Sequence, residues 1–96
     1  MRNGMRPIPP GEILREQLEE LGLSASALAS ALHVPANRMT GILNGTRAIT
    51  ADTALRLARY FGTSAKFWLN LQQSYELRRA ELEVGRSIAR MVKPAA

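Results

Sequence analysis

Two short helical segments separated by a tripeptide constrain the fold of this chain more than any other feature of the sequence. The first, Ala25–Leu32, follows Ser24, whose hydroxyl can cap a helix by accepting a hydrogen bond from a free backbone amide. The second, Ala36–Leu43, follows Pro35, and proline suits the start of a helix because its missing N–H would be unpaired there. Because His33-Val34-Pro35 is too short to form a long loop, the two helices must cross steeply.

Three further helices are predicted around this pair, and no strand pattern or repeat is visible in the sequence. One lies upstream, between the interruption at Pro9-Pro10-Gly11 and the stop signal Gly22. Two lie downstream, after the predicted caps Thr50 and Ser64, and the last of them continues toward Pro94. The apolar positions expected on the buried faces are Ile13, Leu14, Leu18, Leu21, Ala54, Leu57, Ala58, Phe61, Phe67, Trp68 and Leu71. The sequence therefore predicts an all-α chain of five helices.

The distribution of charge favours a polyanionic partner. The net charge is +5, and neither Asp nor Glu occurs from Leu21 to Ala51, a stretch that contains Arg38 and Arg47. A surface without carboxylates can approach phosphates without repulsion. The alternative explanation is chance in a segment rich in serine and alanine.

The composition argues against several other classes of protein. Without cysteine the chain has neither disulfides nor thiolate metal sites, and His33 cannot build a metal site by itself. No apolar run approaches the roughly 18–20 residues that a bilayer-spanning helix needs, and residues 1–10 lack the apolar segment of a signal peptide. The sequence contains no Gly-rich phosphate loop and no Ser/His/Asp spacing. We therefore expect a cytoplasmic protein that is not an enzyme, requires no cofactor and has no membrane partner.

The two short helices have the size of a helix-turn-helix unit, and one helix of such a unit fits the major groove of DNA. Residues expected to lock the two helices together are Leu28, Ala29, Val34, Met39 and Ile42. The first half of the second helix then stays exposed. There Asn37 can recognise adenine and Arg38 can recognise guanine, and Thr40 lies on the same segment. Gly41 has no side chain, which predicts close approach of this helix to bases or phosphates.

Residues around the two helices are candidates for contacts with the phosphate backbone. Ser24 and the amides that follow it form a helix start that favours a phosphate. Asn44, Thr46 and Arg47 follow the second helix and can hold the other strand. Purely structural alternatives remain open, because Ser24 and Asn44 can be helix caps and Arg38 can be a solvated arginine. His33 is interpreted as a turn residue with positive φ rather than a catalyst.

Three parts of the sequence resemble HigA-type antitoxins of the Xre, or lambda-repressor-like, helix-turn-helix superfamily. They are Pro10-Gly11-Glu12-Ile13-Leu14 with Leu21-Gly22-Leu23-Ser24, the segment 49–64, and Phe67-Trp68-Leu69-Asn70-Leu71-Gln72. The resemblance covers about residues 8–78. It implies a five-helix, lambda-repressor-like DNA-binding domain that forms a homodimer on a palindromic operator of double-stranded DNA. It also implies a partner toxin similar to HigB, a RelE-like mRNA interferase that depends on the ribosome.

The resemblance also implies roles for individual residues. It places base contacts at Asn37 and Arg38, with Thr40 nearby, and backbone contacts at Ser24, Asn44, Thr46 and Arg47. The sequence departs from the common family pattern at Pro9, His33, Ala36 and Gly41. Of these departures, Gly41 is expected to bear most on the preference for DNA sequence.

We therefore expect an N-terminal extension at residues 1–10, a helix-turn-helix DNA-binding domain at 11–74 and a C-terminal helical tail at 75–96. The predicted function is that of a type II antitoxin that neutralises a HigB-like mRNA interferase and represses its own operon. One alternative is a solitary Xre-type regulator with no toxin. Another is a protein that masks a toxin without binding DNA, because Ala36 and Gly41 leave the recognition surface rather bare.

The tail carries an apolar stripe at Leu77, Val84, Ile88 and Met91, although Gly85 weakens the expectation of one continuous helix. This stripe predicts a dimer or toxin contact, and folding back onto the first helix is the alternative. A second candidate for a toxin contact is the acidic face of the first helix, which is otherwise a solvated face. Its members are Glu12, Glu16, Glu19 and Glu20.

Overall fold

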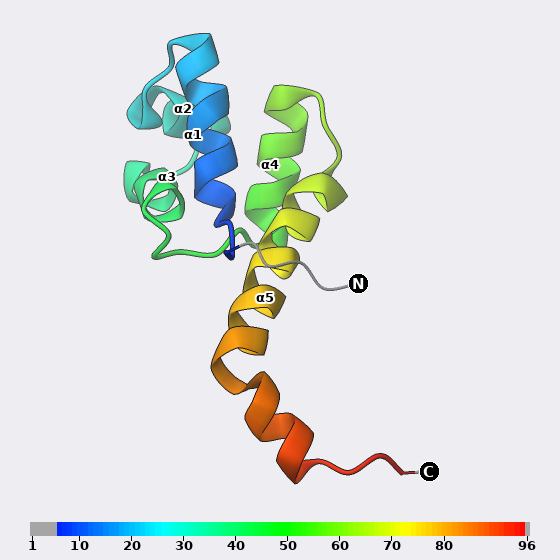
Figure 1. The fold of residues 1–96 in the computed structure, drawn as a ribbon. Helices are drawn as coiled ribbons and strands as arrows, with labels where there is room; N and C mark the ends of the chain where they lie inside the picture. Colours follow the sequence, from blue (N-terminus) through cyan, green and yellow to red (C-terminus); the bar gives the residue numbers. More distant parts are fainter. Residues whose placement is uncertain (1–5, 96) are drawn as a thin grey trace.

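Five helices and no strand make up residues 6–95, the part of the chain that the computed structural model describes (Figure 1). They are α1 (Pro10–Leu21), α2 (Ala25–Leu32), α3 (Ala36–Leu43), α4 (Ala51–Phe61) and α5 (Ala65–Met91). The predicted all-α, five-helix fold is confirmed. The predicted extension at residues 1–10 lies partly outside the described residues, and α1 already begins at Pro10.

Local capping residues set most of the helix boundaries. Ser24 Oγ accepts a hydrogen bond from the amide of Ala27 at 3.1 Å, and Ser64 Oγ accepts one from the amide of Phe67 at 3.0 Å, which confirms both predicted caps. Thr50 occupies the N-cap position of α4, but its hydroxyl donates to Thr53 Oγ1 at 3.5 Å. Thr50 is therefore confirmed as the N-cap residue of α4, although its side chain accepts no capping hydrogen bond from a backbone amide.

α1 packs closely against α3 at a glycine. Gly11 is buried, and a Cβ atom at this position would clash with the carbonyl oxygen of Ile42 and lie 3.0 Å from Leu43 Cα. Both of those atoms belong to the backbone, so neither can rotate aside. The absence of a side chain at Gly11 thus sets the distance at which α1 crosses α3.

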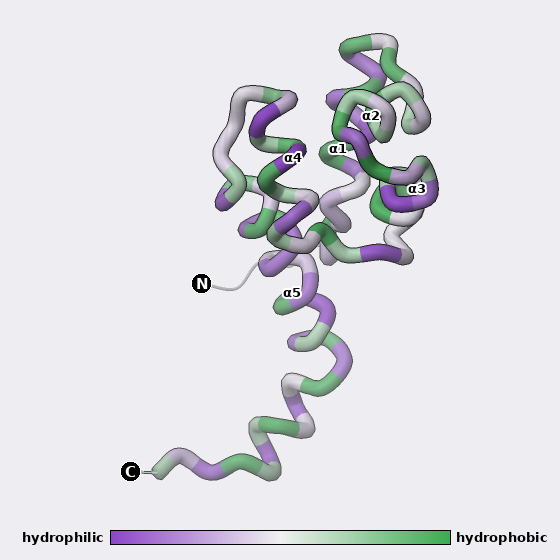
Figure 2. The backbone as a smooth tube through the Cα atoms, turned by 180° about the vertical axis from the view of Figure 1, so that it is seen from behind, coloured by the Kyte–Doolittle hydropathy of each residue, from purple (hydrophilic) through white to green (hydrophobic). Residues whose placement is uncertain are grey.

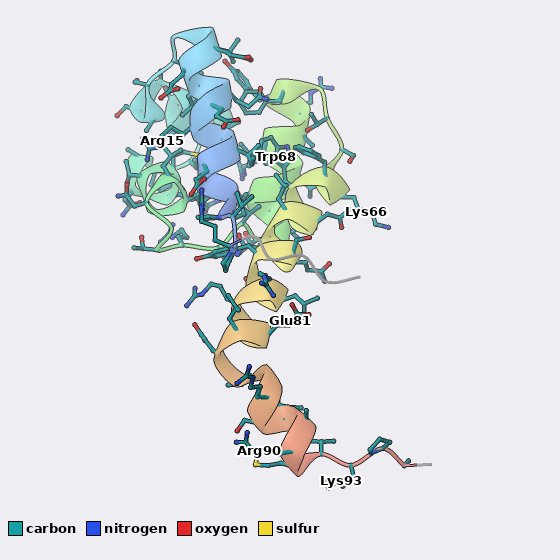
Figure 3. The ribbon with its side chains drawn as sticks, viewed as in Figure 1. Arg15, Lys66, Trp68, Glu81, Arg90 and Lys93 are labelled. Atoms are coloured by element: carbon teal, nitrogen blue, oxygen red, sulfur yellow. The ribbon has the colours of Figure 1, made fainter. Side chains whose placement is uncertain are left out.

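The core lies where all five helices meet. Leu14, Leu28, Met39 and Leu57 are fully buried, and they come from α1, α2, α3 and α4. α5 contributes Trp68, which is 1% exposed and lies between α1 and α4 (Figure 3). Its indole N–H donates to Thr63 Oγ1 at 2.8 Å, so burial of this large ring leaves no polar atom unpaired. The predicted burial of these five residues is confirmed.

Five residues expected in the core lie at its edge. Leu21 is the last residue of α1 and is 56% exposed, and Phe67 is 41% exposed. Neighbouring positions on a helix point about 100° apart, and on α5 it is Trp68 that faces the core, while Phe67 lies at its edge. The Phe67 ring packs edge-on against Trp68, with 5.0 Å between centroids. The side chains of three further expected core residues are only partly buried, namely Phe61, Ile13 and Leu71. The prediction of full burial at these five positions is wrong.

α5 is one continuous helix of 27 residues that passes through Gly85. Its first part packs against α4 and α1, and the rest extends away from the bundle as an arm, which we define as residues 77–91 (Figure 1). The arm gives the described chain an elongated shape of 51 × 23 × 22 Å. Folding of this stretch back onto α1 is therefore ruled out, and the predicted domain limit at residue 75 falls inside a helix.

The arm keeps its apolar stripe in solvent. Leu77, Val84, Ile88 and Met91 are between 43% and 70% exposed. Hydrophobic and hydrophilic segments alternate along this part of the chain in Figure 2, as expected of an amphipathic helix without a partner. Among residues 6–95, no helix has both the length and the apolar character needed to cross a membrane.

Candidate nucleic-acid interface

The α2–α3 pair is held together by small and apolar side chains at the crossing. Leu28, Ala29, Met39 and Ile42 are buried, and Val34 packs against them from the turn. The turn is tight because His33 adopts the left-handed conformation, with φ at +60°. Its amide and that of Val34 donate back to carbonyls of α2. These observations confirm the predicted contacts and the positive φ at His33.

The exposed side of α3 carries two of the three predicted base-contacting residues. Asn37 and Thr40 are exposed. The hydroxyl of Thr40 donates to the Asn37 carbonyl oxygen at 3.3 Å, so its proton is used within the helix. It can still accept a hydrogen bond through its oxygen. The Asn37 amide is the side chain on this surface with both a donor and an acceptor to offer to a base.

Arg38, the third predicted base-contacting residue, is bound to a carboxylate on another helix. Its Nη1 donates to Asp52 Oδ1 at 2.8 Å, and 29% of the Arg38 side chain is exposed. Asp52 stands in the first turn of α4, where the helix dipole favours an acidic residue whatever its other contacts. The stretch without Asp or Glu from Leu21 to Ala51 is therefore not a surface without carboxylates, because α4 places one against α3.

Asp52 is itself anchored by a second arginine. Arg56 Nε donates to the same Oδ1 at 2.8 Å, one helical turn along α4. Arg56 Nη1 donates to the Leu32 carbonyl at 2.8 Å and, at 3.5 Å, to that of His33. The hydrogen bonds from Arg56 and Arg38 hold the pKa of the Asp52 carboxyl below its usual range. We call Arg38, Asp52 and Arg56 the clamp, since they join α3, α4 and the end of α2.

The segment after α3 folds back onto that helix at Gly41. The carbonyl of Gly41 accepts hydrogen bonds from the amides of Thr46 and Arg47, at 2.9 and 3.1 Å, and from the Thr46 hydroxyl at 3.3 Å. A Cβ on Gly41 would lie 3.0 Å from Arg47 Cβ. The interpretation that Gly41 leaves room for DNA is thus corrected, because Arg47 and Thr46 occupy that space. The same contacts place Thr46 and Arg47, both predicted to contact phosphates, against α3.

The end of α3 is stabilised from two sides. Asn44 occupies the C-cap position, and its backbone N–H donates to the Thr40 carbonyl at 2.9 Å. This geometry fits the interpretation of Asn44 as a helix cap. The Asn44 side chain is exposed. Arg15 of α1 donates from Nη2 to the Leu43 carbonyl at 3.2 Å, and it points toward α3 in Figure 3. This role of Arg15 could not be predicted from the sequence, because a contact between residues 28 positions apart leaves no local signal.

Ser24 lies at the edge of a shallow surface hollow near the end of α3. The hollow is lined by residues that include Ser24, Leu43, Arg15 and Glu19. The Ser24 hydroxyl accepts the capping bond from Ala27, and its own proton remains available to a phosphate oxygen. Glu19 is the unfavourable element of this hollow for an anion. The predicted capping and phosphate-binding roles of Ser24 are compatible in geometry.

The sequence profile of the helix-turn-helix family matches residues 14–68, more than half of the chain and all of α2, α3 and α4. The chain belongs to the Xre-type helix-turn-helix family. In the described part of this family member, no three His, Cys, Asp or Glu side chains gather as they would around a metal ion.

Relatives of this family member are similar over most of its length. Virulence-associated protein I of Dichelobacter nodosus is 58% identical over 83% of this chain and 75% of its own. An addiction module antidote protein of the HigA family from Coxiella burnetii is 56% identical, with a TM-score of 0.92 over 94% of this chain and 99% of its own. Antitoxin HigA of Pseudomonas aeruginosa, solved with the higBA promoter, is 48% identical, with a TM-score of 0.91 over 95% of this chain and all of its own. None of these three names describes an enzyme.

Proposed function

We propose that this protein is a type II antitoxin that represses its own operon as a homodimer on a palindromic operator and neutralises a HigB-like mRNA interferase. One observation carries the proposal. The Pseudomonas aeruginosa antitoxin solved with promoter DNA matches this chain at a TM-score of 0.91 over 95% of its length, too large a share to leave out α5. At 48% identity, a likeness that includes both the helix-turn-helix unit and the arm supports a shared function.

In the proposed complex α3 enters the major groove. Its exposed Asn37 would pair with adenine, and Arg38 with guanine, while Thr40 accepts a hydrogen bond beside them. Thr46 and Arg47, which pack on α3 at Gly41, would contact the backbone of the DNA. Asn44 and the Ser24 end of α2 would contact further phosphates. Two such units would enter successive major grooves about 34 Å apart.

The arm supports the dimeric part of the proposal. A helix that leaves Leu77, Val84 and Ile88 exposed in the single chain gains stability when a partner covers that face. A second copy presents the same stripe and can form a two-fold contact. The acidic face of α1, with Glu16, Glu19 and Glu20 exposed, is then free to meet a basic toxin. A chain that binds an operator in this way acts in the cytoplasm.

A cell-based experiment separates the proposed function from its alternatives. The promoter upstream of the gene drives a reporter, and an adjacent toxin-like reading frame is placed under separate control. We expect the protein both to repress the reporter and to restore growth when the toxin is induced. Repression without rescue would make the protein a solitary regulator. Rescue without repression would make it a toxin-masking protein.

A matched pair of variants connects the result to the structure. Asn37→Ala removes an exposed side chain of α3, and Asn70→Ala removes an exposed asparagine of α5 outside the helix-turn-helix unit. Asn37→Ala should weaken repression and leave growth rescue intact, whereas Asn70→Ala should leave repression unchanged. Equal repression by the two variants would exclude α3 as the surface that recognises the operator.

A further inference from the structure

We infer that Asp52 is a specificity-determining residue that positions Arg38 for a guanine and weakens the binding of Arg38 to phosphates. This inference rests on the proposed binding of operator DNA and adds a residue that makes no contact with the bases itself. Asp52 lies at the start of α4, outside the helix-turn-helix unit, and it reaches α3 through a 2.8 Å hydrogen bond.

Within the clamp, Asp52 fixes one edge of the Arg38 guanidinium. Asp52 accepts from Nη1, and among residues 6–95 the Nε and Nη2 groups of Arg38 make no hydrogen bond. These two groups form a pair of parallel donors, which is the arrangement that the O6 and N7 atoms of guanine accept. An arginine without such a partner samples many rotamers and loses their entropy on binding. Because Asp52 already holds the Arg38 guanidinium in one orientation, less rotamer entropy is lost when Nε and Nη2 bind a guanine in that orientation.

The anchoring of Asp52 makes this positioning effective. Arg56 holds the same carboxylate oxygen at 2.8 Å and is itself fixed to the Leu32 carbonyl at 2.8 Å. The Arg38 guanidinium is therefore linked through two side chains to the backbone at the end of α2, which is part of the same rigid unit. A change of the Arg38 rotamer would have to break a contact that the fold itself supports.

The charge of Asp52 acts against binding at random sites. Its carboxylate is 59% exposed beside α3, so it repels phosphates that come close to the same surface. Without it, Arg38 is a mobile cation that can pair with any phosphate of any sequence. Asp52 therefore lowers affinity for random DNA and keeps affinity for a site with guanine in the correct place.

The test compares Asp52→Asn with Glu83→Gln, which makes the same change of charge. Glu83 also forms an exposed ion pair, at 3.4 Å with Arg79, but it lies on the arm. Each protein selects sequences from a randomised duplex library, and fluorescence anisotropy then gives the affinity for the wild-type consensus and for a scrambled duplex. Arg38→Ala identifies the base position that depends on this arginine.

We expect the wild type to select guanine at one symmetric position of each half-site, and Arg38→Ala to lose that preference. Asp52→Asn should lose roughly tenfold of the guanine preference at the same position, since one bidentate base contact contributes about that much discrimination. Its affinity for the scrambled duplex should rise several-fold, with a salt dependence steeper by about one phosphate contact. Glu83→Gln should change both affinities in equal proportion.

Two results would overturn the inference. In one, Asp52→Asn keeps the wild-type guanine preference and the wild-type ratio of specific to random affinity. In the other, it loses affinity for both duplexes alike and melts at a lower temperature, which would make Asp52 a purely structural contact. Arg56→Gln is the second variant, and it should weaken the guanine preference without raising random affinity because Asp52 keeps its charge. A wild type that selects no sequence at all would instead refute the proposed function.

Discussion

Replacing Gly11 with alanine should destabilise the protein, although the same change inside a helix normally stabilises it. Alanine exceeds glycine by up to about 1 kcal/mol in helix propensity. At Gly11, however, the new Cβ would clash with the Ile42 carbonyl oxygen and lie 3.0 Å from Leu43 Cα. Because these are backbone atoms, α1 and α3 must separate to admit the methyl group.

The size of the effect follows from these two opposing contributions. Overpacking of a tight core costs about 1–3 kcal/mol, and the upper part of that range applies where backbone has to move. After the gain in propensity, we expect a net loss of about 2 kcal/mol in the free energy of unfolding. For a domain of this size, roughly 4–8 °C per kcal/mol converts this loss to a fall of about 8–16 °C in Tm.

Circular dichroism melting at one protein concentration measures this fall, and Gly85→Ala is the matched control. A Cβ on Gly85 would have the Glu81 Cβ at 4.0 Å as its nearest neighbour, an ordinary contact. That variant should therefore gain up to about 1 kcal/mol from helix propensity. Equal or higher Tm for Gly11→Ala than for the wild type would refute the argument that Gly11 sets the α1–α3 distance.

Three more predictions concern the clamp and the arm. Arg38→Ala should cost roughly 1–3 kcal/mol on the specific site and relax sequence preference, whereas an equal loss on random DNA would reduce Arg38 to a phosphate contact. The lowered pKa of Asp52 means that its ion pairs contribute stability above the carboxyl pKa of the unfolded chain, about 3.9, and lose it as pH falls through the folded value. The denaturation midpoint should therefore fall less on acidification in Asp52→Asn than in the wild type, and superimposable curves would contradict this. Val84→Ser with Ile88→Ser should produce monomers in sedimentation equilibrium while far-UV spectra stay helical, and an unchanged dimer would exclude the arm as its interface.

The helices could be predicted because their boundaries depend on local residues. Ser24 and Ser64 cap helices through amides three positions away, and Gly62 ends α4 in the left-handed conformation. The residues that lock α2 against α3 could also be predicted, since the turn between them allows little choice. In these places the sequence signal and the structure it specifies lie within a few residues of one another.

The clamp could not be predicted, because its members meet only in the folded chain. Arg38 and Asp52 are 14 positions apart on different helices, and each alone has an ordinary interpretation, as a DNA-contacting arginine and as a helix-dipole acid. The role of Gly41 was predicted wrongly for the same reason. The space beside Gly41 is occupied by Arg47, a residue that follows the end of α3. Phe67 was assigned to the core wrongly because apolar character does not show which of two adjacent aromatic residues faces the core, and in the structure that residue is Trp68.

The most direct test of operator binding is fluorescence anisotropy of the purified protein on the duplex from just upstream of its own gene. A scrambled duplex of equal length and composition serves as the control, at roughly physiological salt, where non-specific binding is weak. We expect the protein to bind the upstream duplex at least ~10³-fold more tightly than the scrambled one. We also expect a stoichiometry of two chains per site. Equal, weak binding to both duplexes would contradict the proposed repressor and leave toxin masking as the function to test.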